Sequence, residues 1–384
     1  MLLDTTLREG EQAFGVYMDI AAKRYIVETL ARAGIEELEI GYVGQECLPA
    51  LLEHARRVAP HMAVSVWCRC READVRAAAE LGVRRINMGV PVSHAHITER
   101  LRTTEAALRD QLAAVISLAR SRGISFISLG LEDCSRAEID DAVRMAGFGV
   151  GLGAARIRLS DTVGLLTPVS TAQLVTRFRA SLPRETRIGT HFHNDFGMAT
   201  ANAITALVYG ADCADVSVLG IGERAGIARL EEVAAACLLR LAGESHFRAY
   251  DLPLLRALAE DIAELAHVVI PRNRPILGQD IFAVESGLHT DGLQKQPSLF
   301  EPFDPALVDG RRLVGLGRKS GRAAVVGAAR DAGFELEQEA ADMLVKRVRD
   351  VADRLNRTLH DEEFRELCHE CAGASPPRSS SGNM

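Results

Sequence analysis

Eight short β-type segments, each followed by a longer segment with helical periodicity, occupy residues 2–241 of this 384-residue chain. The expected strands span residues 2–5, 38–41, 63–68, 85–90, 125–131, 155–160, 187–191 and 214–219. Regular alternation of strands and helices implies a parallel sheet with right-handed crossovers. Eight units of this size favour a closed (β/α)8 barrel, an α/β fold. A doubly wound sheet is disfavoured because no glycine-rich dinucleotide fingerprint follows the first strand.

The alternation stops near residue 245, and a mixed, then mainly helical, pattern follows. We therefore expect a (β/α)8 TIM barrel over residues 1–245, followed by a smaller, mainly helical C-terminal region. Within that region we expect a linker or subdomain over 246–325 and C-terminal helices over 326–372. Residues 373–384, GASPPRSSSGNM, have the composition of a disordered tail.

The composition excludes several classes of function. The chain is 47% hydrophobic and 25% charged, as in ordinary globular proteins, and its net charge of −7 gives no reason to expect nucleic-acid or membrane binding. It contains no apolar run of about 18 residues and no N-terminal signal pattern, so we expect a cytoplasmic protein. The eight scattered cysteines are then expected to be reduced thiols.

Polar side chains follow the expected strands at their C-terminal ends, where barrel enzymes place their catalytic groups. In chain order the candidates are Arg8 and Glu9, Glu39, Arg69, His96, Glu132, Thr162, His191 and His193, and Glu223. Any one of them is compatible with an ordinary loop residue. Ionisable or hydrogen-bonding groups at all eight strand ends are harder to explain as solvated surface, and this pattern predicts a site at that end of the barrel.

His191 and His193 stand two residues apart at the end of the seventh expected strand. Side chains in a strand alternate with period 2, so both imidazoles point the same way. Two adjacent imidazoles form half of a divalent-metal site. An isolated His-x-His is equally compatible with a half-buried surface pair, so the interpretation depends on a carboxylate at another strand end.

Four motifs carry a family resemblance. They are DTTLREGEQ from Asp4, HFHNDFGMATANA from His191, GIGERAG from Gly220 and ESGLHTDG from Glu285. Together they resemble the metal-dependent acyltransferase/lyase barrels, a family that includes the 2-isopropylmalate, homocitrate and citramalate synthases and 3-hydroxy-3-methylglutaryl-CoA lyase. The matches extend from residue 4 to about residue 322 and therefore cover most of the chain.

The resemblance favours one branch of this family. Glu9 stands where many members carry Asp, and the runs SVWCR at 65–69 and VPVS at 90–93 resemble the homocitrate synthases of nitrogen-fixation clusters. The expected reaction is then a Claisen-type condensation of acetyl-CoA with 2-oxoglutarate, followed by thioester hydrolysis.

Four departures from the family pattern, Ile227, Val284, Phe300 and Lys319, leave other substrates open. The alternatives are synthases of 2-phosphonomethylmalate, 2-phosphinomethylmalate, 2-isopropylmalate, citramalate or Re-citrate. A function of another class also stays open: a barrel that binds a metal or a metabolite without turnover.

The resemblance implies a role for each residue of the metal centre. Glu9, His191 and His193 would bind a divalent metal. One oxygen and two nitrogen ligands are compatible with Mg, Mn, Co or Zn, so they do not identify the metal. The 2-oxo acid would chelate this metal through its keto oxygen and carboxylate. Arg8 would stabilise the developing alkoxide, and Glu39 would orient Arg8.

The remaining candidates concern proton transfer and substrate binding. His289 would be the general base that enolises acetyl-CoA, with Glu132 as its acid/base partner. In the family this histidine reaches the active site of the neighbouring subunit, which implies a homodimer. Thr162 or His96 would bind the substrate carboxylate. Arg69 would pair with a distal anionic group of the 2-oxo acid.

Overall fold

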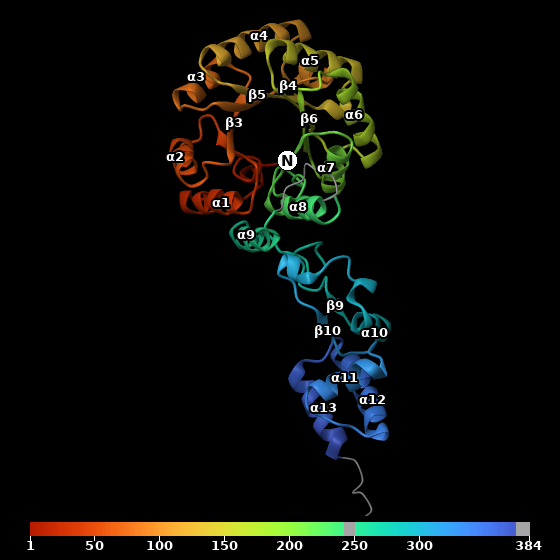
Figure 1. Ribbon diagram of the computed structural model, residues 1–384. Coiled ribbons are helices and arrows are strands. Elements are labelled where there is room, and N and C mark those ends of the chain that lie inside the picture. The colour runs from red at the N-terminus through yellow and green to blue at the C-terminus, as the bar shows by residue number, and fades with distance from the viewer. Residues whose placement is uncertain (242–249, 374–384) are drawn as a thin grey trace, which may run out of the picture. The chain divides into compact units, whose positions relative to one another are not determined.

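The structure is a computed structural model that describes residues 1–241 and 250–373. Eight parallel strands close into a barrel in chain order, and β1 pairs with both β2 and β8 (Figure 1). The strands are β1 (Leu2–Asp4), β2 (Glu37–Tyr42), β3 (Ala63–Arg69), β4 (Arg85–Pro91), β5 (Phe126–Glu132), β6 (Arg156–Asp161), β7 (Arg187–Phe192) and β8 (Cys213–Val216). The predicted closed (β/α)8 barrel is confirmed.

Eight helices surround this sheet (Figure 1). They are α1 (Ile20–Arg32), α2 (Leu48–Val58), α3 (Glu72–Glu80), α4 (Glu105–Ser121), α5 (Ile139–Leu152), α6 (Pro168–Ser181), α7 (Ala199–Val208) and α8 (Leu230–Leu239). Local sequence fixes several of their starts. The side chains of Asp19, Thr104 and Thr167 each accept a hydrogen bond from the first turn of α1, α4 and α6, respectively.

Helix α5 ends at Leu152, and its last seven residues include three glycines. Glycine lowers helix propensity, so the local sequence argues against this last part of the helix. Tertiary packing outweighs that cost: a methyl group at Gly149 would collide with Leu129 of β5. The glycine therefore lets α5 approach the sheet closely.

The barrel interior carries charged side chains as well as aliphatic ones. Glu37 and Glu39 on β2, and Arg156 and Arg158 on β6, are all buried. Arg156 donates to both carboxylate oxygens of Glu37, at 3.0 Å each. Buried charges persist only when they form ion pairs. Because the two charged residues of each strand stand two positions apart, both of their side chains point toward the barrel axis.

The chain divides into two compact units, Met1–Ile270 and Pro271–Met384. Helix α9 (Leu252–Leu265) belongs to the first unit, because its buried side chains face α1 and α8. The first unit therefore runs past residue 245. The expected domain boundaries at 245/246 and 325/326 stay predictions. The expected disordered tail lies outside the described residues from 374 onward, and Gly373 is the last residue of α13.

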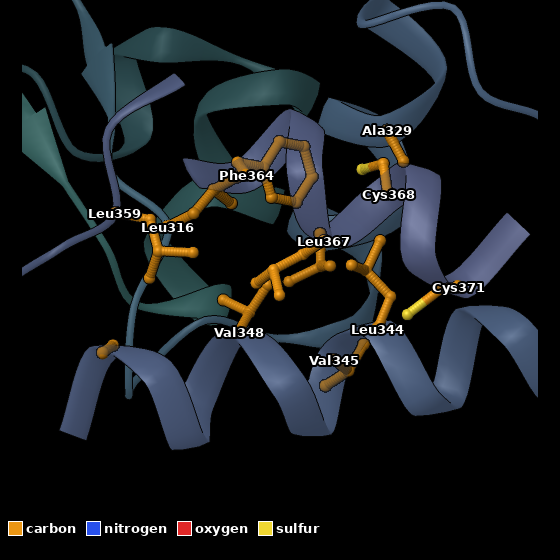
Figure 2. Packing of buried hydrophobic residues seen from close by; sticks show 12 residues of the cluster. Leu316, Ala329, Leu344, Val345, Val348, Leu359, Phe364, Leu367, Cys368 and Cys371 are labelled. Atoms are coloured by element: carbon orange, nitrogen blue, oxygen red, sulfur yellow. The ribbon is translucent and has the colours of Figure 1, made fainter. Parts of the chain in front are cut away.

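The second unit is mainly helical and has a core of its own. Its elements are β9 (Ala283–Val284), α10 (Gly287–Lys295), β10 (Leu313–Val314), α11 (Arg322–Asp331), α12 (Gln338–Leu355) and α13 (Asp361–Gly373). The core packs Leu344 and Val348 of α12 against Phe364, Leu367 and Cys368 of α13 (Figure 2). Short helical turns complete the described chain at Gly10–Gln12, His96–Arg100, Cys134–Arg136, Val218–Gly220, Pro297–Leu299 and Pro305–Val308. None of the helices described here has the length and apolarity needed to cross a membrane.

Candidate metal centre and active site

Glu9, His191 and His193 meet at the C-terminal ends of β1 and β7. One possible ligand atom from each residue lies within 4.8 Å of the others, and all three side chains are buried. Glu9 Oε2 is 3.7 Å from His191 Nε2, and the two imidazole rings are 5.3 Å apart. Within residues 1–241 and 250–373 no other group of three such ligands occurs. The carboxylate that the His-x-His pair required is therefore present.

Two neighbouring loops hold Glu9 in place. Its Oε1 accepts a hydrogen bond from the backbone N–H of Glu223 at 3.1 Å, and its Oε2 pairs with Arg8. A Cβ atom at Gly222 would lie 3.0 Å from Glu9 Cγ, so the loop after β8 packs directly against this side chain. Because β1 and β8 are neighbours in the closed barrel, the two loops meet.

The electrostatic environment keeps Glu9 and His193 in the forms that bind metals. Burial acts to raise the pKa of Glu9, but Arg8, His191 and His193 outweigh it and hold the pKa below its usual range. Burial, with His191 adding to it, lowers the pKa of His193 to about 4. His193 Nδ1 is buried and finds no hydrogen-bond partner among the described residues. A carboxylate and two imidazoles suit a divalent metal, so the residues fit the predicted centre.

Behind these ligands, buried ion pairs connect Arg8 to His191. Arg8 Nε lies 2.9 Å from Glu39, and Arg158 Nη1 lies 3.5 Å from Glu39 and 3.0 Å from Asp215. Asp215 Oδ2 is also 2.9 Å from His191 Nδ1. Burial acts to raise the pKa of Glu39, but Arg8 and Arg158 lower it to about 2. Glu39 was predicted from the sequence, whereas Arg158 and Asp215 were not.

Arg69 and Glu132 line one cavity of about 550 Å³ at the ends of β3, β4 and β5. Arg69 is 54% exposed and binds Asp74 through two hydrogen bonds of 2.9 Å. Glu132 pairs with Arg100, which lines the same cavity together with Arg71. Arg69 also lines a second cavity of about 430 Å³, where Arg8 is a further lining residue. The structure therefore places Arg69 between the Arg8 side of the site and Glu132.

His96 and Thr162 instead meet around Asp133, a fully buried residue that was not predicted from the sequence. The Thr162 hydroxyl accepts a hydrogen bond from the Asp133 backbone N–H at 2.8 Å. His96 Nε2 lies 3.8 Å from Asp133 Oδ2 and 3.3 Å from Arg136. Both predicted substrate ligands thus have protein partners, and neither lines the two cavities at Arg69.

Two models of known protein families match this chain. A family model described as HMGL-like matches residues 1–262, which hold the barrel and most of α9. The chain belongs to this HMGL-like family. A second model, described as homocitrate synthase post-HMGL domain-like, matches residues 276–356. The two matches fall separately in the two compact units of the structure.

Several relatives of this HMGL-like protein are named synthases. The chain is 38% identical to homocitrate synthase from Frankia alni, over 84% of this chain and 90% of that protein. It is 36% identical to 2-phosphonomethylmalate synthase from Streptomyces rubellomurinus, over 97% and 98%. It is 34% identical to 2-isopropylmalate synthase 2 from Caldanaerobacter subterraneus subsp. tengcongensis, over 95% and 94%. These relatives confirm the predicted family and the predicted synthase type of enzyme.

The barrel is also similar to a solved structure of the HMG-CoA lyase from Brucella melitensis. The TM-score is 0.61, with 20% sequence identity over 69% of this chain and 98% of that chain. At this level of identity the likeness concerns the fold alone.

His289 lies in the second unit, at the start of α10. Its Nδ1 is 2.7 Å from the Ser286 hydroxyl, which also caps the helix, and its ring packs against Phe300 at 4.4 Å. The side chain is exposed, and its Nε2 makes no hydrogen bond to a described residue.

The structure shows the contacts of three residues that depart from the family pattern. Ile227 is fully buried and forms a β-bridge with His193. The Lys319 backbone N–H donates to Glu285 at 2.9 Å. Phe300 is the ring against which His289 packs.

Proposed function

We propose that this protein condenses acetyl-CoA with a 2-oxo acid and then hydrolyses the thioester, with 2-oxoglutarate as the favoured substrate. The observation that carries the proposal is the meeting of Glu9, His191 and His193 beside Arg8 at the C-terminal end of the barrel. The homocitrate synthase relative and the match of the second unit to the homocitrate synthase domain support 2-oxoglutarate.

The residues around the metal centre have distinct roles in this proposal. A divalent ion, Mg, Mn, Co or Zn, would be held by Glu9, His191 and His193, and when bound it supplies Lewis-acid polarisation of the keto group. Arg8 donates hydrogen bonds to the oxygen that gains negative charge as the new bond forms. Glu39, 2.9 Å from Arg8 Nε, orients that guanidinium.

Enolisation of acetyl-CoA requires a base outside the ligand set. His289 fills this role, because Ser286 engages its Nδ1 and leaves the exposed Nε2 to take the proton. Glu132, at the cavity beside Arg69, is its acid/base partner. We propose that the protein is a homodimer in which His289 acts on the site of the neighbouring subunit.

Mixing inactive variants tests this arrangement. Glu9→Ala and His289→Ala each abolish activity, but a mixed dimer keeps one site with both residues intact. A statistical mixture should recover up to about a quarter of wild-type activity. Glu9→Ala mixed with Arg8→Ala is the control, because both changes lie on the barrel and no site is restored. Failure of the first mixture to recover activity while mixed dimers form would contradict the cross-subunit role.

The arginines of the cavity bear on the distal group of the 2-oxo acid. Arg69, Arg71 and Arg100 line that cavity with Glu132, which suits a substrate with an anionic distal group. A phosphonate-bearing pyruvate is the second candidate, because the same arginines suit a phosphorus oxyanion and a 2-phosphonomethylmalate synthase is among the relatives.

Release of the CoA thiol reports the reaction with each candidate. Purified protein with metal and acetyl-CoA is supplied with 2-oxoglutarate, oxaloacetate, 2-oxoisovalerate, pyruvate, phosphonopyruvate or phosphinopyruvate in turn. We expect the largest kcat/KM with 2-oxoglutarate. Release with none of them would favour a barrel that binds without turnover.

Arg69→Ala tests the distal contact. We expect a loss in kcat/KM of at least about tenfold on the preferred substrate with a charged distal group, and a much smaller loss on 2-oxoisovalerate. Arg76→Ala is the matched control, because Arg76 pairs with Glu72 on the exposed face of α3 and does not line the cavity. Equal losses on the two substrates would exclude the distal role of Arg69.

A further inference from the structure

Asp215 of β8 connects a candidate metal ligand to the charged interior of the barrel. The residue is buried, and its Oδ2 lies 2.9 Å from His191 Nδ1 and 3.0 Å from Arg158 Nη1. Arginine has no acceptor and stays charged, so its partner oxygen is a carboxylate oxygen. That oxygen can only accept, which makes His191 Nδ1–H the donor. Nε2 is then the ring nitrogen available to a metal, and it lies 3.7 Å from Glu9 Oε2.

The two histidines differ in this respect. His193 Nδ1 is also buried, but within the described chain it has no hydrogen-bond partner. The sequence presents His191 and His193 as equivalent members of one alternating pair, whereas the structure anchors only His191. An imidazole with an acceptor behind it keeps one tautomer and one ring orientation, which raises its affinity as a ligand.

Arg158 extends this anchor to the other side of the metal centre. Its Nη1 lies between Asp215 and Glu39, at 3.0 and 3.5 Å, and Glu39 accepts from Arg8, which pairs with Glu9. All of these side chains are buried. The single guanidinium therefore compensates two buried carboxylates, Asp215 behind His191 and Glu39, which reaches Glu9 through Arg8.

We propose that Asp215 and Arg158 are positioning residues that hold His191 in its metal-binding tautomer and couple its position to that of Glu9. The proposal rests on the metal centre of the proposed function and is independent of the substrate. It also makes Asp215 specific to one ligand, since His193 lacks such a partner.

Binding of Mn²⁺ to the metal-free protein, measured by calorimetry, tests the proposal. We expect Asp215→Ala to weaken Mn²⁺ binding by about 10- to 100-fold. Asp215→Asn should weaken it less, because its amide oxygen still accepts from Nδ1–H. Arg158→Met should weaken binding in the same direction. Glu37→Gln is the matched control: Glu37 is equally buried in the barrel and paired with Arg156, so its loss should lower stability and leave Mn²⁺ affinity unchanged.

Unchanged Mn²⁺ affinity in Asp215→Ala, or an equal fall in Glu37→Gln, would overturn the proposal. If Asp215→Ala does not fold, the Asn variant and nitrogen NMR of the histidine rings test the proposal instead. Wild-type His191 should carry its proton on Nδ1. A single ring proton on Nε2 would overturn the proposal. A protein that binds Mn²⁺ with this dependence on Asp215 but releases no CoA would contradict the proposed function and leave this inference standing.

Discussion

At the scale of single residues, the candidate ligands Glu9 and His191 depend on the groups packed behind them. Asp215 accepts from His191, while Glu9 is held by Arg8, by the Glu223 N–H and by the bare backbone of Gly222. A ligand set of three side chains thus requires a larger set of contacts that a motif does not display. Gly222 is the clearest case, because its contribution is the absence of a side chain.

Gly222→Ala should therefore damage the metal centre although no ligand is substituted. The new Cβ would lie 3.0 Å from Glu9 Cγ and 3.1 Å from Oε1, so Glu9 must shift. We expect Mn²⁺ affinity to fall on the order of tenfold, as for other changes behind a ligand. Gly147→Ala in α5 is the control, because its Cβ would meet no atom within 4 Å. Wild-type affinity in Gly222→Ala would show that the loop adjusts without moving Glu9.

At the scale of strands, the alternation of side chains explains how charges come to fill the barrel. The i, i+2 pairs Glu37/Glu39 and Arg156/Arg158 face the axis from β2 and β6 and pair across it. Branched aliphatic residues usually fill this space. The pairing makes each charge dependent on a partner from another strand.

Arg156→Met tests that dependence. Arg156 is fully buried and binds Glu37, Asn87 and Ser128, so its removal leaves the Glu37 carboxylate buried without its main partner. We expect the free energy of unfolding of the barrel to fall by about 3–5 kcal/mol in urea titrations. Arg156→Met combined with Glu37→Leu should recover much of that loss. A double variant no more stable than the single one would show that shape, rather than charge pairing, dominates here.

Strand periodicity also sets how much of the fold and site could be predicted from sequence. The eight strands and the shared direction of His191 and His193 follow from local alternation. Asp215 could not be found this way, because its contact with His191 depends on the register of β7 and β8 and on closure of the barrel. A polar residue inside an otherwise apolar strand, as in CADV of β8, was the available signal. Arg69 was found, but not its partner Asp74, which lies in α3.

At the scale of the whole molecule, two units with separate cores imply two unfolding transitions. The barrel unit holds the metal centre, and the second unit has its own core between α11, α12 and α13. Two-state behaviour is therefore not expected of the full chain. Each transition can serve as the internal control for a change made in the other unit.

The stability of the barrel unit should depend on pH through Asp4. This residue lies at the end of β1, where the barrel closes onto β8. Burial raises the pKa of Asp4 to about 7, and Glu231 and Asp215 add to the rise, against hydrogen bonds from Thr6 that lower it. In the unfolded chain the carboxyl has its ordinary pKa near 3.8. Between about pH 4 and pH 7 the folded barrel thus holds a proton that the unfolded chain releases. Its stability therefore falls as pH rises, by at most about 1.4 kcal/mol per pH unit from this group, and levels off above pH 7.

Asp4→Asn removes the titrating group but keeps an oxygen that accepts from the Thr6 N–H, 2.9 Å away in the wild type. Relative to the wild type, we expect the variant's barrel to lose this fall in stability between pH 4 and 7 and to be the more stable of the two at pH 8. Urea titrations across this range measure the difference. The transition of the second unit should be the same in both proteins, because Asp4 lies in the first unit. Parallel pH curves for the two barrel transitions would show that Asp4 is ionised in the fold at neutral pH and that its burial is compensated by the Thr6 hydrogen bonds.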